Sequence, residues 1–541
     1  MVRFRRMTLW ALCWALASCA PGYRPPPPAP PVGHQPLAKK PKSRNPSLAA
    51  EMVDKTFAYQ IRQGLDLPRQ ARRLLGRPYE ALNVDAFDRV PDSRWFTNRN
   101  ADLPLSPERV RRGVDHGGPP DTSAAWQVVG LKTAGVTPGL TVKDAAGARF
   151  IIKFDPPAYP GLGSATEAVV SRLLHAAGYH VPENHIVYFD PAALVPGPGA
   201  TVFAPDPDYR RRPPAKRPLR QADLDAVLRR VNPEGAPRLR ALASRFLPGI
   251  PVGPWAYTGV RRDDRNDRVP HEHRREVRGL YVVASWVNHA DMKEENTLDM
   301  YDPDARLLTH YLIDFGAAMG SNSTGASNPR RGQANSFDLR DSLLRLLSLG
   351  LYSPAYERAP RVVTHPEVGY LENDLFRPDG WKAMYPVPAF ENLTRRDAFW
   401  GARIVTSFSD AQIEAAVDEG RFRDPEAARI MADFLKVRRD RIGRHWFGRV
   451  NPLDDFAVAG GTLSFKDLAV ERGYAAERGY RYRVRDGEGR EVAVGQVGKP
   501  GLPLMPDWPE TAVVEIAPAA DGGSGPVRVF LDAGLVVGVR R

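Results

Sequence analysis

Cysteine is scarce in this sequence. Only two of its 541 residues are cysteines, Cys13 and Cys19, and both lie close to the N-terminus. Two cysteines cannot supply the framework of several disulfides that stabilises small secreted domains, and they exclude a zinc site built from cysteines. The stability of the folded protein must therefore come from a hydrophobic core, which a chain of this length can bury in two to four domains.

Long apolar runs are also missing. The apolar run at residues 7–16 is shorter than the roughly 20 residues that a membrane-spanning helix needs. Three arginines precede it, and the small residues Ala17 and Ser18 follow it. Because this order is typical of a cleavable signal peptide, we predict that residues 1–18 are removed on export.

The end of this segment resembles a known processing signal. Leu16-Ala17-Ser18-Cys19 is similar to the lipobox of bacterial lipoproteins. The resemblance implies that Cys19 is acylated, becomes the new N-terminus and anchors the protein to a membrane of the cell envelope. We expect the outer membrane rather than the inner one. An ordinary secretory signal with an incidental cysteine is the alternative.

Acidic residues are too few to balance the basic ones. The chain has 76 lysines and arginines against 63 aspartates and glutamates, which gives a formal net charge of +13. Basic segments near a bilayer are attracted to it, so anionic lipid headgroups or an anionic envelope polymer are favoured as partners over nucleic acid. The alternative is an arginine-rich surface that is simply solvated.

Several common catalytic motifs are absent. The sequence has no Gly-x-Ser-x-Gly, no His-Glu-x-x-His and no Walker-type phosphate loop. These motifs supply the nucleophile, the zinc ligands or the phosphate-binding loop of large enzyme classes. The sequence therefore disfavours membership in the common hydrolase classes and in the P-loop enzymes.

The first part of the chain after the signal is rich in proline. Eight residues from Arg24 to Pro31 include six prolines. Such a segment adopts an extended polyproline conformation, so we predict that residues 19–47 form a tether that holds the folded part away from the membrane. Helical periodicity starts at Leu48 and stops at Gly76, which predicts a helical and loop extension over residues 48–125.

The remainder of the chain is predicted to be a mixture of helices and strands, an α+β fold. Strand-like segments at 126–131, 140–143 and 149–154 predict a meander, and a helix is expected at 164–177. We divide the rest into a strand-rich unit with an arginine- and proline-rich insertion, a mostly helical unit and a small β module: 126–260, 261–450 and 451–541.

Two short motifs carry the most chemical information. They are His289-Ala290-Asp291-Met292-Lys293-Glu294-Glu295-Asn296 and Ile313-Asp314-Phe315-Gly316. Together they resemble the catalytic and metal-binding loops of the protein kinase superfamily. The loop in the meander lacks Gly-x-Gly-x-x-Gly, so it resembles more the atypical HipA-like and phosphoinositide-kinase-like branches, as do residues 178–183 after the helix. Ala290 replaces the arginine common in protein kinases. The resemblance implies a bilobal domain with a strand-rich and a helical lobe.

The resemblance also implies a role for each matched residue, with ATP and Mg²⁺ as the ligands. Lys153 would hold the nucleotide phosphates, and Glu167 would orient Lys153 by an ion pair. Asp291 would accept the proton of the attacking hydroxyl, while Asn296 and Asp314 would hold the metal. Gly135 and Gly139 would belong to the loop that covers the phosphates, and His289 would brace the catalytic loop.

Each of these residues also has a simpler interpretation. Ser164-Ala165-Thr166-Glu167 fits a capping box, in which Glu167 would bind the start of its own helix. Lys153 could be a solvated residue at a strand end, and the other three could form a structural loop network. His271 and His273 are a separate candidate pair for metal binding, although surface or helix-start positions explain them as well.

Three functions remain open. The first is an ATP- and Mg²⁺-dependent phosphotransferase that acts on an envelope molecule. The second is a non-catalytic binding protein of the envelope on a kinase-like scaffold, which export favours because the periplasm is not known to contain ATP. The third is a metal-dependent hydrolase that uses His271, His273 and nearby acids. The presence of Asp291, Asn296 and Asp314 favours the first.

Overall fold

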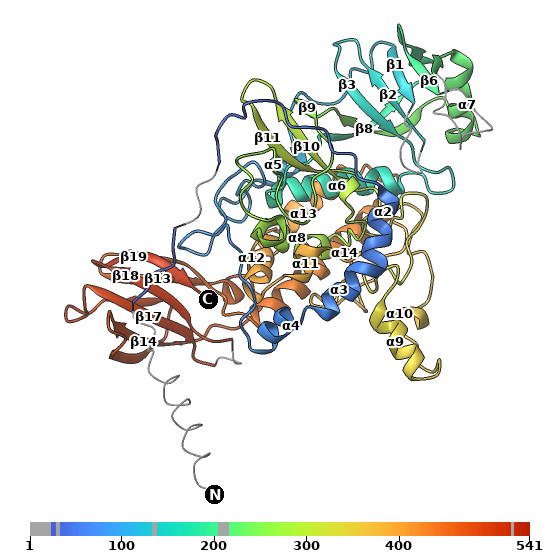
Figure 1. Cartoon of the computed structure of the whole chain (residues 1–541). Helices are drawn as coiled ribbons and strands as arrows, with labels where there is room; N and C mark the ends of the chain where they lie inside the picture. Colours follow the sequence, from blue (N-terminus) through green and yellow to red (C-terminus); the bar gives the residue numbers. More distant parts are fainter. Residues whose placement is uncertain (1–22, 29–32, 132–137, 204–215, 521–523) are drawn as a thin grey trace, which may run out of the picture.

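A computed structural model of the chain describes residues 23–28, 33–131, 138–203, 216–520 and 524–541. The fold mixes helices with several sheets, as the sequence predicts, and a largely antiparallel β module forms the C-terminal part (Figure 1). Cys19 lies outside the described residues. In the part of the chain that the structure describes, none of the helices combines the length and apolar character that crossing a bilayer requires.

The predicted meander forms the centre of a six-stranded sheet with the order β4-β8-β3-β2-β1-β5. All neighbours pair antiparallel except β1 and β5. Alternate residues such as Val142 and Ile152 are buried on one face, where they form a small core with Trp126. The strands are β1 (Trp126–Leu131), β2 (Gly139–Lys143), β3 (Arg149–Lys153), β4 (Asn184–Phe189), β5 (Leu194–Pro196) and β8 (Leu239–Arg245).

Helix α6 (Leu162–Ala177) follows the meander and ends at Gly178, whose φ of 120° suits a residue without a side chain. Fourteen of its sixteen residues are buried, because it packs between the sheet and the helical part of the molecule. Between β4 and β8 lie η2 (Pro191–Ala193), β6 (Thr201–Phe203), β7 (Lys216–Pro218) and α7 (Gln221–Val231), and the insertion predicted at residues 205–240 includes β7 and α7.

A second, three-stranded sheet interrupts the region that the sequence analysis predicts to be mostly helical. It has the order β11-β10-β9 and consists of β9 (Ile250–Pro251), β10 (Thr297–Asp302) and β11 (Leu307–Leu312). The sequence analysis did not predict this sheet, because β9 has only two residues and its pairing with β10 joins segments almost 50 residues apart. Strand β8 leads directly into β9, so residues 246–249 connect the two sheets.

Helices form the middle of the molecule below these sheets (Figure 1). All twelve residues of α8 (Arg275–Trp286) are buried, and Gly279 and Gly401 allow it to approach α12 closely. The others are α5 (Pro107–Arg112), η3 (His271–His273), η4 (Glu294–Asn296), α9 (Leu339–Leu347), α10 (Ala355–Arg358), α11 (Pro388–Glu391), α12 (Arg395–Val405), α13 (Asp410–Asp418) and α14 (Pro425–Phe447).

The C-terminal module contains two sheets around their own apolar core. One sheet has the order β12-β13-β16 and the other β15-β14-β17-β18-β19. A short helix, α15 (Leu468–Glu471), lies between β13 and β14. The strands are β12 (Leu453–Ala459), β13 (Thr462–Asp467), β14 (Tyr480–Asp486), β15 (Glu491–Val497), β16 (Gly501–Pro503), β17 (Thr511–Pro518), β18 (Val527–Asp532) and β19 (Leu535–Arg540).

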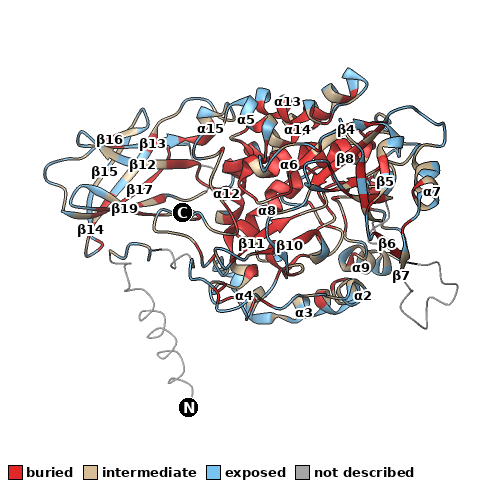
Figure 2. Cartoon of the chain, turned by 90° about the horizontal axis from the view of Figure 1, so that it is seen from above, coloured by how far each residue is buried: buried red, intermediate tan, exposed pale blue. Residues whose placement is uncertain are grey.

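A sealed cluster of charges joins the extension, the helical part and the C-terminus. Asp397 of α12 pairs with Arg275 at 3.1 Å and with Arg278 at 3.2 Å, and Arg275 also pairs with Asp88. Arg541, the last residue, lies 3.5 Å from Asp88. These side chains are at most 3 % exposed, so solvent does not reach their charges. Figure 2 shows that most of the residues in this middle region are buried.

The segment predicted as a free tether packs on the body along residues 33–46. Leu37 is buried against Val252 and Leu308, and its amide donates to the carbonyl of Arg306 at 2.8 Å. The amide of Arg44 donates to the carbonyl of Val252 at 3.0 Å. The tether interpretation was wrong for these residues, because backbone hydrogen bonds to distant segments compensate for their low hydrophobicity.

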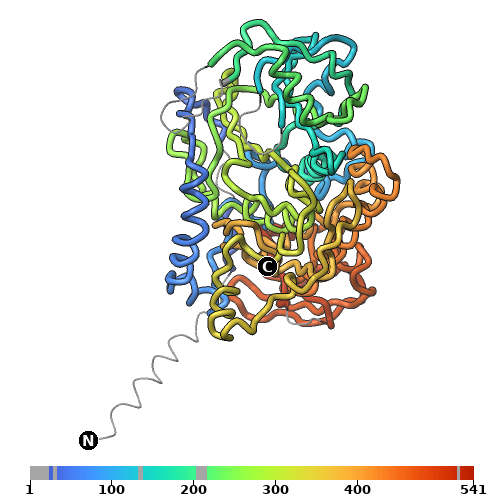
Figure 3. Tube along the Cα trace, turned by 90° about the vertical axis from the view of Figure 1, so that its right-hand side faces the viewer, coloured from blue at the N-terminus to red at the C-terminus, as the bar shows by residue number. Residues whose placement is uncertain are grey.

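Four short helical segments follow along one side of the molecule (Figure 3). We call residues 48–77 the N-terminal arm. It contains α2 (Leu48–Val53), the π-helical η1 (Asp54–Ala58), α3 (Tyr59–Leu65) and α4 (Leu67–Leu74). The helical run is interrupted after Leu65, where Asp66 caps α4 through the amide of Arg69, and Gly76 follows the last helix.

Candidate functional site

The two sheets enclose a cleft of about 970 Å³. Apolar side chains line both walls: Leu131 and Ile151 from the six-stranded sheet, and Leu298, Met300 and Ile313 from the β9–β11 side. Arg149 and Arg245 add positive charge near the connection between the sheets. A cleft with apolar walls and basic groups suits a flat, apolar ring system that carries an anionic tail.

Lys153 lies in this cleft between two carboxylates. Its Nζ is 2.8 and 2.9 Å from the two carboxylate oxygens of Glu167 and 3.0 Å from Oδ1 of Asp314. Burial alone would lower the pKa of the Lys153 ammonium, but Glu167 and Asp314 raise it above its ordinary value. The predicted Lys153–Glu167 ion pair is confirmed, and the interpretation of Lys153 as a solvated strand end was wrong.

Local structure explains why Glu167 can reach Lys153. Helix α6 starts at Leu162 with Gly161 as its N-cap, so Glu167 lies inside the helix. Asp155 instead accepts from the amide of Ser164 at 2.8 Å and from the amide of Gly161 at 3.1 Å. The capping-box interpretation of Glu167 was therefore wrong, because another carboxylate occupies that role.

Asp314 follows strand β11 at a point where the backbone turns sharply. Its φ is +63°, a left-handed conformation that non-glycine residues rarely adopt and that often occurs at functional sites. The amide of Ile313 donates to the carbonyl of Asn296 at 3.0 Å, and Phe315 is fully buried. The neighbours of Asp314 in the chain are thus held in place, while its own side chain remains 46 % exposed in the cleft.

Asn296 and Asp291 form the next part of the site. The Nδ2 of Asn296 donates to the backbone carbonyl of Asp291 at 2.7 Å and to its carboxylate at 3.1 Å. Asn296 lines the same cleft as Lys153 and Asp314. Of the four residues that the resemblance brings together, Lys153, Asn296 and Asp314 line one cleft, whereas Asp291 is not among its lining residues and adjoins them through Asn296.

His289 supports this loop from inside the protein. Its ring is buried and packs edge-on against Phe315, with centroids 5.6 Å apart. Burial lowers the pKa of His289, although the nearby carboxylate of Asp291 opposes this shift. The ring is therefore turned into the protein, an orientation that suits the bracing role implied by the resemblance.

The sequence analysis missed two cations beside Asp291. The Nζ of Lys293 lies 3.4 Å from the Asp291 carboxylate. Burial lowers the pKa of the Arg331 guanidinium while Asp291 raises it, which places this arginine within electrostatic reach of the same carboxylate. Lys293 lies inside the recognised motif, two residues after Asp291, so its contact with Asp291 could have been predicted. Arg331 lies in a loop that contains no recognisable motif.

The glycines of the predicted phosphate-covering loop are only partly described. Gly139 begins β2 and pairs directly with Lys153. Gly135 lies outside the described residues. Asn45 and Pro46 also line the cleft, which brings the N-terminal segment to its edge.

His271 and His273 do not form a metal site. His271 is buried and bonded to Asp267 at 2.7 Å and to the carbonyl of Ala256, while His273 bonds to Arg278. Among the described residues, no group of three or more histidines, cysteines or acids is arranged to hold a metal ion. Both histidines belong to the helical turn before α8, as the simpler interpretation predicts.

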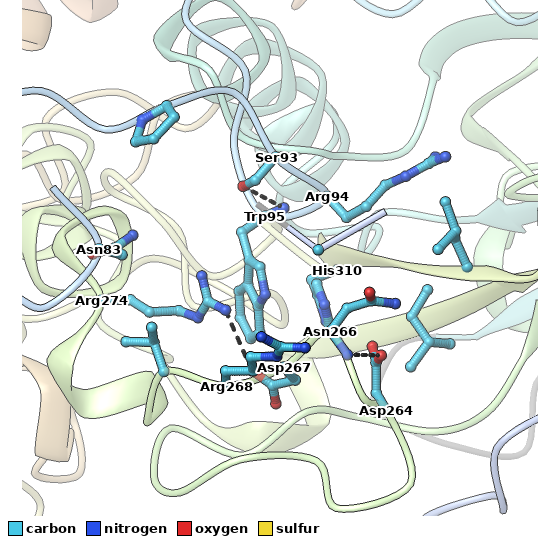
Figure 4. A pocket seen from close by; sticks show the side chains of 15 residues that line it. Asn83, Ser93, Arg94, Trp95, Asp264, Asn266, Asp267, Arg268, Arg274 and His310 are labelled. Carbon is cyan, nitrogen blue, oxygen red and sulfur yellow. Dashed lines mark hydrogen bonds and ion pairs between the residues drawn. The ribbon is translucent and has the colours of Figure 1, made fainter. Parts of the chain in front are cut away.

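Figure 4 shows a smaller cavity of about 160 Å³ close to His271. Its centre is Trp95, which stacks on His310 with centroids 3.7 Å apart and lies under the guanidinium of Arg274 at 4.7 Å. Since both faces of the indole are covered by neighbouring side chains, this cavity is a space at the contact between the N-terminal extension and β11. It contains none of the predicted site residues.

Comparison with known proteins adds no assignment. No protein-family model matches the chain, and neither curated proteins nor solved structures give a match. The chemistry of the site therefore rests on its own geometry.

Proposed function

We propose that this protein is an ATP- and Mg²⁺-dependent phosphotransferase with a bilobal, kinase-like domain, anchored in the cell envelope as a lipoprotein. The observation that carries the proposal is the double ion pair of Lys153 with Glu167 and Asp314 inside the cleft. These three residues come from a strand, a helix and a loop that are far apart in the sequence. A structural ion pair would not require such a cleft beside it.

The cleft offers separate positions for the parts of a nucleotide. The apolar walls near Leu131, Ile151 and Leu298 suit the adenine ring. Lys153 provides a fixed ammonium for the phosphates, and Glu167 holds this ammonium in place because it is buried and contacts it with both oxygens. Positioning of this kind is the main contribution that proteins make to phosphoryl transfer.

Asn296 and Asp314 fit a magnesium site because both present hard oxygen donors on the same side of the cleft. The amide nitrogen of Asn296 is committed to Asp291, so its oxygen is the end that can face a cation. Bound Mg²⁺ would neutralise the charge that develops on the phosphate oxygens. The rigid backbone around Asp314 keeps its carboxylate in position for this role.

Asp291 is the candidate base. It would accept the proton of an acceptor hydroxyl as the oxygen of that hydroxyl attacks the terminal phosphorus and ADP leaves. Its hydrogen bond from Asn296 orients the carboxylate, and Lys293 supplies a positive charge beside it. The acceptor is a molecule of the envelope, in agreement with the lipid anchor proposed at Cys19.

Nucleotide binding is the direct test. We expect ATP with Mg²⁺ to raise the melting temperature of the purified protein, because a ligand that binds only the folded state stabilises it. Asp314→Asn should abolish the Mg²⁺-dependent part of this shift. Asp304→Asn is the matched control, since Asp304 is exposed in the turn between β10 and β11. No shift in the parent protein at millimolar Mg²⁺ and ATP would reject the proposal.

The anchor is tested separately. Cys19→Ala should move the protein from the membrane fraction to the soluble fraction after a wash with high salt, which removes purely electrostatic binding. A variant that remains bound after the wash would contradict lipidation at Cys19 as the dominant attachment.

A further inference from the structure

The N-terminal arm presents an unusual surface. Val53, Phe57, Ile61 and Leu65 follow one another at intervals of four residues, so they form a ridge along one face of α2–α3. Their exposed fractions lie between 53 % and 72 %. A helix on the surface of a soluble protein normally turns such a face toward the core. Here the ridge points outward.

Polar contacts, together with the burial of Lys55 and Tyr59, hold the arm to the body. The carboxylate of Glu51 accepts from the amide of Glu294 at 3.1 Å, and the side chain of Gln60 donates to the carbonyl of Phe337 at 2.9 Å. Arg69 and Arg73 both donate to the carbonyl of Glu391. The orientation of the arm is therefore determined by hydrogen bonds, which leave its apolar side uncovered among the described residues.

Helix α9 extends this apolar surface. Phe57 contacts Phe337, which lies just before α9, with ring centroids 5.3 Å apart. The side-chain oxygen of Gln60 accepts a hydrogen bond from the amide of Leu339, the first residue of α9. Leu346 and Leu347 on α9 are more than 70 % exposed, and Leu349 and Leu351 after it are about 90 % exposed. Figure 2 shows α2, α3, α4 and α9 along the same edge of the molecule.

The charges beside the ridge are mainly basic. The arm contains six lysines and arginines but only three acidic residues. Helix α4 has no acidic residue; its Arg69 and Arg73 donate to the carbonyl of Glu391, and Arg72 is exposed next to Leu74 and Leu75. Leucine beside arginine on one short helix is the pattern of helices that lie in a membrane interface and contact anionic headgroups.

We propose that the ridge of the arm together with α9 is a docking face for an anionic lipid bilayer. The sequence position of the predicted anchor agrees with this, because the four residue-to-residue steps from Cys19 to Tyr23 can span at most about 14 Å. Tyr23 is itself fixed to the body by a hydrogen bond to the carbonyl of Gly487. An acylated Cys19 would hold the body against the bilayer, and the docking face would then set its orientation. This inference does not depend on the proposed phosphotransfer.

The experiment uses the full chain as the Cys19→Ala form, so that no acyl anchor contributes. It measures co-sedimentation with vesicles of phosphatidylcholine, with and without about 30 % phosphatidylglycerol. We expect binding to the anionic vesicles that weakens as salt is added. Ile61→Ser combined with Leu65→Ser should lower the partition coefficient about tenfold or more, because two apolar side chains no longer enter the interface.

The matched control is Leu103→Ser combined with Leu535→Ser, which removes two exposed leucines away from the arm. It should bind vesicles like the parent, and the melting temperatures of both variants should equal that of the parent because all four side chains are exposed. Equal loss of binding in both variants, or none in the ridge variant, overturns the proposal. Self-association of the parent without vesicle binding, abolished in the ridge variant, also overturns it and identifies an interface between two copies of the chain.

Discussion

Two clusters of charged side chains in this protein have opposite relations to solvent. The cluster of Asp397, Arg275 and Arg278 is sealed among helices, and its side chains are at most 1 % exposed. The cluster of Lys153 and Asp314 opens onto a cleft, where almost half of the Asp314 side chain is exposed. Both contain short ion pairs between distant segments. Ion pairing alone therefore does not identify a functional site; the adjoining cleft and the accessible carboxylate are what make the Lys153 cluster the candidate site.

The sealed cluster should dominate stability. Asp397→Ala leaves the buried guanidinium of Arg278 without a carboxylate partner and that of Arg275 with Asp88 alone, and we expect it to lower the free energy of unfolding by about 3–5 kcal/mol. Chemical denaturation of the variant and the parent measures this loss. Asp410→Ala, at an exposed carboxylate that pairs with Arg439, serves as the control and should cost less than about 1 kcal/mol. Similar losses in both variants would mean that burial does not distinguish the two clusters.

The open cluster should dominate activity instead. Asp291→Asn removes the candidate base while keeping the shape of the side chain, so we expect Mg²⁺-dependent nucleotide binding to persist and phosphotransfer to fall at least about a hundredfold. Thermal shift with ATP and transfer of labelled phosphate measure the two effects on one preparation. Parallel loss of nucleotide affinity in Asp291→Asn and Asp314→Asn would show that the two roles are wrongly assigned.

As the pH falls, histidines whose pKa is lowered by burial should become protonated, and so destabilise the fold, before the carboxylates of the sealed cluster do. Burial lowers the pKa of His180 to about 4, and Arg99 contributes in the same direction. Burial alone would raise the pKa of Asp88, but Arg275, Arg396 and Arg541 lower it below its ordinary value, so this carboxylate stays ionised. A histidine whose pKa is depressed by folding binds protons better in the unfolded state. Its contribution to stability is full above about pH 6.5 and is lost as the pH falls toward 4.

Unfolding by urea at pH 7.5 and pH 4.5 tests this expectation. His180→Gln replaces the imidazole by a group that is neutral at both values. The variant should lose less stability than the parent on acidification, by on the order of 2 kcal/mol. If both proteins lose the same amount, His180 is not buried in its neutral form.

The candidate site could be predicted to a large extent because its parts are short and local. The motifs around Asp291 and Asp314 are each set by adjacent residues, and the pattern of alternating residues correctly places Lys153 at the end of a strand. Arg331 could not be predicted, since it approaches Asp291 only through the folding of a long loop. The capping interpretation of Glu167 failed because the sequence does not reveal that Asp155, nine residues before Ser164, caps the helix instead.

The N-terminal segment shows where sequence reasoning is weakest. Residues 33–46 have little hydrophobic character and many prolines and basic residues, which is typical of a linker. They nevertheless pack on the body through Leu37 and through hydrogen bonds such as that between Gln35 and Asn266, 231 positions away. Contacts over such a separation leave no pattern in the local sequence.

The sequence by itself determined the order of the strands in the meander, the periodicity of the arm and the order of the residues that meet in the cleft, because each depends on neighbouring residues. The spacing of Phe57, Ile61 and Leu65 already predicts that the arm has an apolar face. Only the tertiary structure decided that this face points away from the core, since hydrogen bonds from Glu51, Gln60 and the arginines of α4 occupy the inner side. The direction of a helix face depends on distant partners, and these are present only in the folded protein.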